Sequence, residues 1–310
     1  MIKKETKLDF GQLKVPITLL IVFWAIAISL WQLWGRVFWL FNFGYIGTSI
    51  AVGLGVYLVL PKKKKRWGRR LAQFLVGTYM LVFLGFILKE NMQIEGFFFY
   101  LLVGAYGGST IHYFVAKLVG PLIFNRGWCG WSCWTAMILD LLPFKRNKPG
   151  RLARKWEFLR YIHFALSLGL VLILWFGFDY RDQSSDFTSL YWLIAGNLLY
   201  YVIAITLAYA LKDNRAFCKY VCPIPVLQKI PSRFSLMKVE GDAETCTGCG
   251  ACDRMCPMDI QVSQYTLANK RVLSSECILC NECIDVCNQE ALGITFAFDF
   301  GTEELLNRRS

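Results

Sequence analysis

The chain has 310 residues, of which 55% are hydrophobic and 16% aromatic, and its mean hydropathy is +0.41. This composition is too apolar for an ordinary soluble domain. The net charge of +12 is compatible in sign with nucleic-acid binding, but the basic residues fall in short segments between long apolar runs. That pattern favours a membrane protein that contacts lipid and binds no nucleic acid.

Six apolar stretches are long enough to cross a hydrocarbon core as helices, which takes about 20 residues. They are residues 16–34, 38–60, 71–88, 96–118, 160–178 and 189–211. Between them, 61–70 and 145–160 carry seven basic residues each, whereas 89–95 and 179–188 are slightly acidic. Cytoplasmic loops retain Lys and Arg, so we expect the basic loops and both termini on the cytoplasmic side of a bacterial inner membrane, and the acidic loops outside.

Two stretches share one pattern, NRGWCGWSC at 125–133 and NRAFCKYVC at 214–222. The same offset relates the flanking sequence, so that 66–133 and 155–222 resemble two copies of one unit. Each unit has a basic start, a helix out, an acidic loop, a helix back and a CxxxC pair. Copies with one orientation are related by an axis along the membrane normal. Such an axis brings the two pairs together at the inner mouth of a four-helix bundle.

The four thiols of these pairs have several interpretations. They could share a third cluster or a metal ion, act as redox dithiols that relay electrons or hold copper, form disulfides, or lie buried without chemistry. A cytoplasmic location disfavours disulfides. We expect Arg126 and Arg215 to lower the pKa of the neighbouring thiols. The thiols are Cys129, Cys133, Cys218 and Cys222.

The aromatic residues beside the pairs are expected to form an interfacial belt or, less simply, to wall a quinone pocket. They include Trp128, Trp131, Trp134, Phe217 and Tyr220. A short interfacial helix is expected over 134–144, with Asp140 in solvent. In the fourth apolar stretch, small residues favour close helix packing. These residues are Gly104, Gly107 and Gly108.

The C-terminal part contains CTGCGACDRMCP at 246–257 and CILCNECIDVCN at 277–288, and each reads C-x2-C-x2-C-x3-C. In two-cluster ferredoxins, the first three Cys of one motif and the fourth of the other hold each [4Fe–4S] cluster. One cluster is therefore assigned to Cys246, Cys249, Cys252 and Cys287, and the other to Cys277, Cys280, Cys283 and Cys256. Zinc knuckles use two CxxC pairs and explain this spacing poorly. Asn288 follows the second motif where Pro257 follows the first, so the two environments are expected to differ.

His112 and His163 are the two histidines of the chain, and both are expected in the half of the membrane that holds the Cys pairs. Ionisable residues inside a membrane are candidates for function. A bis-His haem is disfavoured, because the duplicate positions are Tyr201 and Phe74. We interpret the histidines as candidate quinone contacts or as interhelical hydrogen-bond partners.

An apolar multi-helix body, CxxxC elements at helix ends and a C-terminal double-cubane ferredoxin resemble the NapH/NosR/CcoG family of membrane iron–sulfur proteins. The resemblance covers most of 66–290, with Pro223 after the second CxxxC as in the family and Trp134 in place of Pro after the first. It implies an electron-transfer subunit of an oxidoreductase, like the quinol dehydrogenase subunits of the NapH type. Members of the CcoG type imply an alternative, copper reduction during oxidase assembly.

The predicted fold is an all-α polytopic membrane protein with duplicated helix pairs and a C-terminal α+β bacterial 2[4Fe–4S] ferredoxin domain. Its expected parts are an N-terminal arm and hairpin, a first repeat, a second repeat and the ferredoxin domain, at 1–60, 61–144, 145–231 and 232–310. The expected function is electron transfer between quinol or quinone, or a partner subunit, and a cytoplasmic ferredoxin-type or reductase partner. The direction of transfer stays open.

Overall fold

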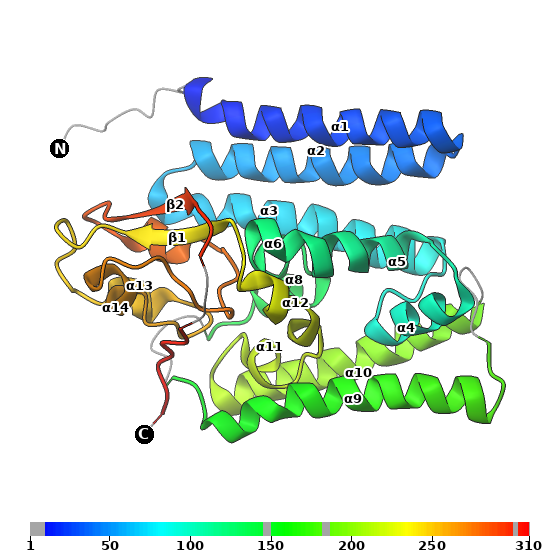
Figure 1. Cartoon of the computed structure of the whole chain (residues 1–310). Coiled ribbons are helices and arrows are strands. Elements are labelled where there is room, and N and C mark those ends of the chain that lie inside the picture. Colours follow the sequence, from blue (N-terminus) through cyan, green and yellow to red (C-terminus); the bar gives the residue numbers. More distant parts are fainter. Residues whose placement is uncertain (1–9, 145–149, 182–186, 300–302, 310) are drawn as a thin grey trace.

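The computed structural model describes residues 10–144, 150–181, 187–299 and 303–309. Long helices lie side by side, and a small domain with the two strands sits at one end of them (Figure 1). Parts of the predicted loops 145–160 and 179–188, and the first nine residues, lie outside the described residues. The chain is thus a mostly helical multi-pass membrane protein with an attached ferredoxin-type domain.

The first two spans form a hairpin at one edge of the molecule (Figure 1). Helix α1 covers Lys14–Trp34 and α2 covers Val37–Val59. Gly35 ends α1 in the left-handed region, with φ of 64°, which permits the tight turn. Only 6% of the apolar window of α1 is buried inside the protein, against 44% for α2. Helix α1 therefore has most of its surface available to lipid.

The third span is continuous from Lys62 to Ile87 and consists of a short 3-10 turn, α3 (Lys65–Thr78) and a π-helical segment η3 (Tyr79–Ile87). Small residues let α2 and α3 approach closely. A Cβ atom on Gly53 of α2 would lie 2.4 Å from the Cβ of Ala72 in α3. Close backbone approach at small residues is a common way for membrane helices to associate.

The fourth predicted span is not one helix. Helix α4 (Ile94–Val103) is followed by a run of α5 (Gly108–His112), η4 (Tyr113–Val119) and α6 (Gly120–Phe124). The helical direction bends by 114° between α4 and this run. The single helix expected over 96–118 was therefore wrong. Among the described residues there are five continuous candidate spans, and six if this bent pair counts as one.

Gly104 makes the bend, whereas Gly108 allows the close packing that was expected: a Cβ atom there would lie 3.2 Å from Leu84 Cδ2 and 3.3 Å from Phe38 Cζ. Gly104 has φ of +74°, and no atom lies within 4 Å of its ideal Cβ position. The N–H groups of Gly108 and Ser109, at the start of α5, donate to the Glu90 carboxylate over 3.0 and 2.6 Å. A carboxylate at a helix start satisfies N–H groups that have no partner within the helix.

The loop expected before α4 is present, but it folds into the protein. Its side chains are buried in the protein, where Gln93 approaches Gly196 of the opposite helix and Asn91 accepts and donates hydrogen bonds within the turn. The buried residues are Glu90, Asn91, Met92, Gln93 and Ile94. A non-helical segment at this position is tolerated because protein, and not lipid, surrounds its polar groups.

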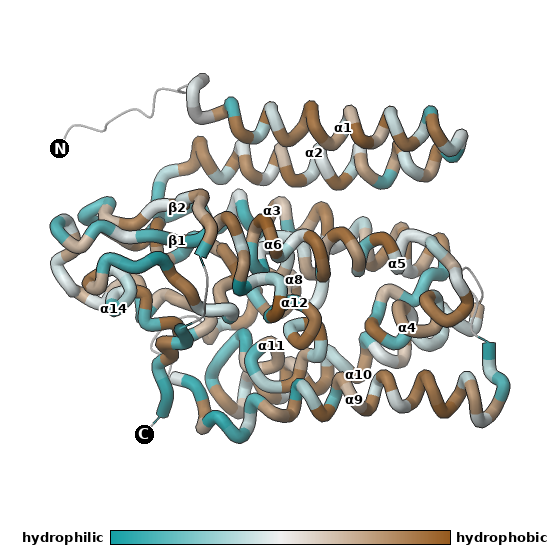
Figure 2. The backbone as a smooth tube through the Cα atoms, in the orientation of Figure 1, coloured by the Kyte–Doolittle hydropathy of each residue, from teal (hydrophilic) through white to brown (hydrophobic). Residues whose placement is uncertain are grey.

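The last two spans are straight. They comprise η5 (Arg154–Phe158), α9 (Leu159–Leu172) and η6 (Ile173–Gly177), followed by α10 (Phe187–Leu211). Hydrophobic residues run along α1, α2, α9 and α10, whereas hydrophilic residues concentrate at the end that holds the strands (Figure 2). This distribution fits a bilayer around the long helices and water around the small domain.

Each CxxxC pair lies in short helices where the bundle meets the ferredoxin domain. The first pair belongs to α7 (Gly127–Trp131) and the start of α8 (Trp134–Leu139). The second belongs to α11 (Ala216–Tyr220) and the turn before α12 (Ile224–Ser232). The long spans α3 and α10 pack against α8, so the pairs are held inside the protein.

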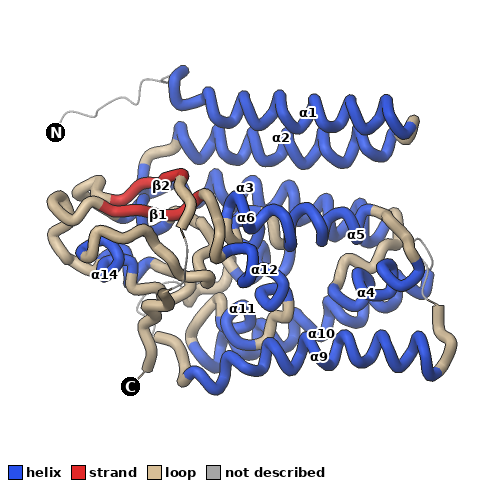
Figure 3. Tube along the Cα trace, in the orientation of Figure 1, coloured by secondary structure: helices blue, strands red, loops and turns tan. Residues whose placement is uncertain are grey.

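The ferredoxin domain has the two strands of the described chain (Figure 3). They are β1 (Met237–Gly241) and β2 (Leu292–Phe296), which pair antiparallel. Three short helices, α13 (Ala251–Met255), α14 (Val262–Leu267) and α15 (Glu282–Val286), complete it. The predicted α+β domain at the C-terminal end of a helical membrane body is confirmed.

Candidate iron–sulfur sites and membrane thiols

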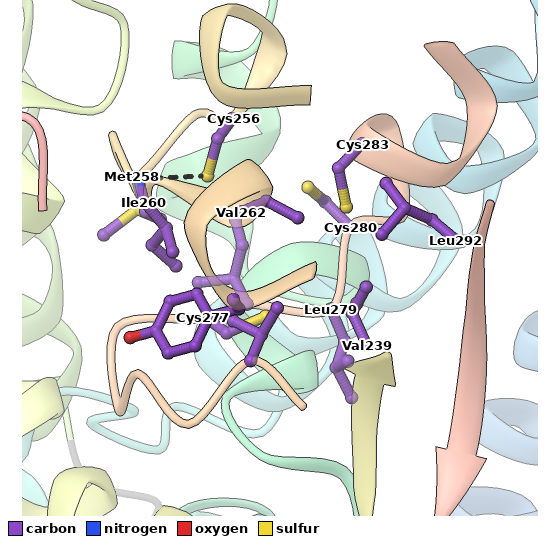
Figure 4. Close-up of a cluster of buried hydrophobic side chains, with 13 residues drawn as sticks. Val239, Cys256, Met258, Ile260, Val262, Cys277, Leu279, Cys280, Cys283 and Leu292 are labelled. Carbon is purple, nitrogen blue, oxygen red and sulfur yellow. Dashed lines mark hydrogen bonds between the residues drawn. The ribbon is translucent and has the colours of Figure 1, made fainter. Parts of the chain in front are cut away.

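The second ferredoxin motif and the last Cys of the first motif surround one cavity. Its volume is about 20 Å³, and all four thiols on its wall are buried (Figure 4). The backbone N–H of Ile260 donates to one of these sulfurs, Cys256 Sγ, over 3.4 Å. Such N–H donors stabilise cluster sulfurs and tune their potential. The four residues are the set expected for one cluster: Cys256, Cys277, Cys280 and Cys283. We call them the inner set.

The two motifs wrap their Cys with the same backbone conformations. The second residue after the first Cys is left-handed in both, Gly248 with φ of 66° and Leu279 with φ of 46°. The residue after the second Cys is also left-handed in both, Gly250 with φ of 65° and Asn281 with φ of 62°. Glycine takes this conformation at little cost, whereas a residue such as Leu is rare there. The second motif therefore depends more on its packing to hold this shape.

The other expected set lies nearer to solvent. Cys249 is exposed, and the remaining three are partly exposed. Asp253 of α13 accepts hydrogen bonds from the N–H and the hydroxyl of Ser263 beside this set. We call Cys246, Cys249, Cys252 and Cys287 the outer set.

The structure brings the four CxxxC thiols together on the wall of a second cavity, of about 50 Å³. Three cations, Lys117, Arg126 and Arg215, share this wall, and no acidic side chain does. The cavity, which we call the thiol cavity, is also lined by polar groups of the bent span and of α10. Its main lining residues are Cys129, Cys133, Cys218, Cys222, Gln93, Tyr113, Asn197 and Tyr200.

Arg215 acts to lower the pKa of Cys133 and Cys218, as expected, but burial outweighs it. Burial raises the pKa of Cys218 to about 11, although Arg215 acts in the opposite direction. Burial likewise raises the pKa of Cys133 and of Cys222. Arg215 Nη1 lies 4.0 Å from Cys218 Sγ and also donates to the carbonyl oxygen of Cys129 over 3.2 Å. Without a bound metal centre, burial therefore favours the protonated form of Cys133, Cys218 and Cys222.

Asp140 was expected in solvent, but it is buried between two arginines. Arg215 donates to both of its carboxylate oxygens, over 2.9 and 2.7 Å, and Arg69 Nη1 donates over 3.0 Å. Burial alone would raise the pKa of Asp140, but the two cations lower it to about 2. This ion pair joins the two repeats, because Asp140 follows the first CxxxC and Arg215 precedes the second.

The first CxxxC pair packs directly on the second ferredoxin motif, at 277–288, which we call the inner motif. The first ferredoxin motif, at 246–257, is the outer motif. A Cβ atom on Gly130 would lie 2.3 Å from the carbonyl oxygen of Ile278, so only glycine fits here. Trp131 Nε1 donates to the carbonyl oxygen of Leu279 over 2.8 Å. Ile278 and Met258 of the ferredoxin domain also line the thiol cavity. One layer of residues thus separates the thiol cavity from the inner set.

A buried carboxylate holds the ferredoxin domain to the membrane helices. Glu276, directly before Cys277, contacts four cations at 2.6–2.9 Å. Burial alone would raise the pKa of Glu276, but the cations hold it well below its usual value. The cations are Arg126, Arg151, Arg160 and Lys229. Two of them belong to the basic segment 145–160, so that segment has a structural role besides its charge toward the membrane.

The two histidines have different surroundings. His163 Nδ1 lies 2.9 Å from the carbonyl oxygen of Val221, and its Nε2 lies 3.3 Å from the Tyr200 hydroxyl, so both ring nitrogens have partners in the protein. His112 lines a third cavity, of about 360 Å³, together with the ring of Trp128. We call it the hairpin cavity, because α1 and α2 supply one of its walls.

The aromatic belt expected around the Cys pairs was wrong for most of its members. Trp128 and Trp134 are buried beside His112, with ring centroids 4.8 and 6.3 Å from the imidazole. Phe217 and Tyr220 are buried as well. Trp128, Trp134 and Phe217 wall the cavities, and the Tyr220 hydroxyl accepts a hydrogen bond from the N–H of Leu152 over 2.8 Å.

Sequence reasoning missed several residues of these sites. Lys117 lies in an apolar run, and a lone cation there is a signal that was available. Glu276 directly precedes a cluster Cys but has no pattern of its own. Glu90 and Gln93 were correctly assigned to a loop, but their burial was missed, because polar residues are usually expected in solvent.

Family models match the regions that hold the Cys. A model described as a 4Fe-4S dicluster domain matches residues 238–288, which contain all eight Cys of the outer and inner sets. A model described as a 4Fe-4S binding domain matches twice, at 106–151 and 195–240. These matches have the 89-residue offset of the predicted duplication, so that prediction is confirmed. The matched regions and the apolar helices together define a membrane iron–sulfur protein of ferredoxin type.

Relatives narrow the class. The chain is 28% identical to a ferredoxin-type protein NapH from Haemophilus influenzae, over 64% of this chain and 70% of the relative. It is 28% identical to an uncharacterized protein of Methanocaldococcus jannaschii, over 76% of this chain and 89% of the relative. It is 25% identical to the putative electron transport protein YccM of Escherichia coli, over 56% and 52%. No solved structure matches the chain. The chain is therefore similar to ferredoxin-type membrane proteins of the NapH kind.

Proposed function

We propose that this protein carries electrons between quinol or quinone in the bilayer, or a partner subunit, and a soluble reductase. Two [4Fe–4S] clusters at the cytoplasmic face of the membrane carry them. The outer set holds one cluster and the inner set the other. When bound, each cluster takes up or releases one electron. The contact between the thiol cavity and the inner motif, through Ile278 and Met258, is the observation on which this proposal rests.

That contact defines an order of sites. The outer set is nearest to solvent, with Cys249 exposed, and suits exchange with a soluble protein. The inner set is buried against α7, and the thiol cavity lies beyond it, among the membrane helices. Electrons can therefore pass from the water-facing end of the molecule to its membrane part through neighbouring sites.

The thiol cavity fits a third iron–sulfur cluster. Four thiolates around a cluster leave it anionic, and the wall supplies Lys117, Arg126 and Arg215 without any acid. Burial disfavours the thiolate form of the free Cys side chains. Iron binding releases the thiol protons and stabilises the thiolates. Among the described residues, no three His, Cys, Asp or Glu side chains are close enough to hold a single metal ion. A cluster spreads its four ligands over four irons and needs no such close group.

A copper-handling role is the second candidate, because a cavity lined by thiols without histidine suits Cu(I). Metal analysis of the purified full-length protein separates the two candidates. About eight irons and eight sulfides per chain mean two clusters, and about twelve of each mean a third. Cys218→Ser should lower about twelve toward about eight, whereas Ser132→Ala, next to Cys133 of the first pair, should not. Copper that co-purifies and is lost in Cys218→Ser favours the copper role.

The redox direction is tested on the same preparation. A titration followed by electron paramagnetic resonance gives the potential of each cluster. Potentials near that of a membrane quinone support electron uptake from quinol. Potentials far below it would contradict quinol oxidation and leave reduction of quinone or of a partner as the only directions.

A further inference from the structure

The hairpin cavity is the largest of the described cavities, and its function is not explained by the Cys sites. Its wall is almost wholly apolar, with side chains from α1, α2, α5 and η4. Phe23, Phe43, Ile46, Val115 and Ala116 are typical of it. A cavity of about 360 Å³ with such a wall matches the size and lining of sites for small apolar ligands.

Two polar groups on this wall have no partner in the protein. His112 Nε2 and Trp128 Nε1 are both buried, and neither has a hydrogen-bond partner among the described atoms. Only 6% of the His112 surface and 9% of the Trp128 surface are exposed. A buried N–H without an acceptor costs about 1–3 kcal/mol, so this pair indicates a ligand that supplies oxygen acceptors. The two rings lie with centroids 4.8 Å apart, close enough to contact one ligand.

The cavity also reaches the iron–sulfur part of the molecule. Leu279 and Asn281 of the inner motif lie on its wall, and they flank Cys280 in the sequence. Trp131, which donates to the Leu279 carbonyl oxygen, lines it as well. A ligand here is therefore one residue layer from the inner set. The Oδ1 atom of Asn281 also has no partner and can accept a hydrogen bond.

We propose that the hairpin cavity binds the head of a membrane quinone. Trp128 Nε1 donates to one carbonyl oxygen, and His112 Nε2 donates to the same oxygen or accepts from the hydroxyl of the quinol, according to its tautomer. The apolar wall holds the ring and the first part of the polyprenyl tail, which leaves along the lipid-exposed hairpin. This inference rests on the proposed function and assigns a site to it.

The test uses the full-length protein with its clusters, in detergent, with decylubiquinone and a short-tailed menaquinone analogue as probes. Binding is measured directly, and a photoreactive quinone is crosslinked and its peptide identified by mass spectrometry. Trp128→Phe and His112→Phe keep an aromatic side chain at each position but remove its polar nitrogen atoms. Each should weaken binding about tenfold, the loss of one buried hydrogen bond. Crosslinks should fall in α2, α5, η4 or α7.

His163→Phe is the matched control, because His163 has both ring nitrogens bonded within the protein. It should bind quinone like the unchanged protein. Val115→Trp is a second test by bulk, since Val115 lines the cavity and is half exposed, so a larger side chain is tolerated in the fold. It should weaken binding at unchanged iron and sulfide content.

Several outcomes would overturn the assignment. If quinone oxidises the reduced clusters but Trp128→Phe, His112→Phe and Val115→Trp all bind it normally, the site is wrong and the proposed function survives. If crosslinks map to α9 or α10, or if only phospholipid acyl chains are recovered from the cavity, the site is wrong as well. If the unchanged protein neither binds quinone nor exchanges electrons with it, both the site and quinone as the redox partner fall.

Discussion

The two ferredoxin motifs have the same Cys spacing and the same backbone turns, yet their surroundings are opposite. The first motif places Gly248 and Gly250 at the left-handed positions and leaves Cys249 in solvent. The second places Leu279 and Asn281 there and is buried against the membrane helices. Spacing thus defines a cluster site, whereas the neighbouring elements define what the site can exchange electrons with.

Charges follow the same division. Beside the inner set, Glu276 is surrounded by four cations, and Arg69 joins Glu282 of α15 to Asp140 of the bundle. Beside Cys287 of the outer set, Lys62 and Glu290 form an ion pair in which both side chains are exposed. The inner motif is thereby part of the membrane assembly, and the outer motif is a surface feature.

Replacing one ligand in each set gives the largest expected contrast. Cys249→Ser should remove about four irons per chain and leave the protein folded in the membrane. Cys280→Ser should remove a similar amount and also lower the thermal stability of the whole protein, because Cys280 belongs to the buried core that contacts α7. Iron analysis and thermal unfolding in detergent measure both effects. Equal unfolding temperatures for the two variants would contradict the division into an inner and an outer motif.

Removing the central carboxylate tests the attachment of the inner motif. Glu276→Gln leaves four cations, three of them buried, without their common partner, which should cost about 3–5 kcal/mol of unfolding free energy. Glu290→Gln is the matched control at the outer side, where an exposed pair contributes about 0–1 kcal/mol. Denaturant unfolding of both variants gives the comparison. A small loss in Glu276→Gln would mean that the ion cluster does not hold the domain.

The same comparison predicts an order of metal loss. An iron chelator should strip the outer cluster well before the inner one, because a ligand exposed to solvent opens at a lower free-energy cost than a buried core. Iron release and the two cluster signals are followed together over time. Arg151→Ala, which weakens the contact to Glu276, should bring the inner loss closer to the outer one. Simultaneous loss of both signals in the unchanged protein would remove the distinction.

The sequence was sufficient for what depends on spacing and on sums over many residues. The C-x2-C-x2-C-x3-C motifs, the apolar runs and the 89-residue offset between the NR-x-aromatic-C stretches indicated the ferredoxin domain, the membrane body and the duplication. Each of these signals is local or repeats along the chain. The convergence of the four CxxxC thiols followed from the duplication and an assumed axis.

The rest depends on contacts between distant residues. A hydropathy window over 96–118 does not register that Gly104 turns the chain through a left-handed conformation. The polar composition of 89–95 predicts a loop but not its burial. The partners of Glu90, the N–H groups of Gly108 and Ser109, lie 18 and 19 residues away in the sequence. Likewise, the effect of Arg215 on thiol pKa values could not be weighed against burial before the depth of Cys218 was known.

The smallest expected effect concerns a contact of α15 that lies close to the outer set in the sequence. The Tyr57 hydroxyl of α2 donates to Asp285 Oδ1 of α15 over 2.7 Å, close to Cys287 of the outer set. Tyr57→Phe removes this bond and keeps the ring, so it should cost about 0.5–1.5 kcal/mol of unfolding free energy. Chelation of the outer cluster should become modestly faster, while the inner cluster should keep its rate. A change confined to the inner signal would show that α15 transmits strain across the domain, because the contact itself lies on the outer side.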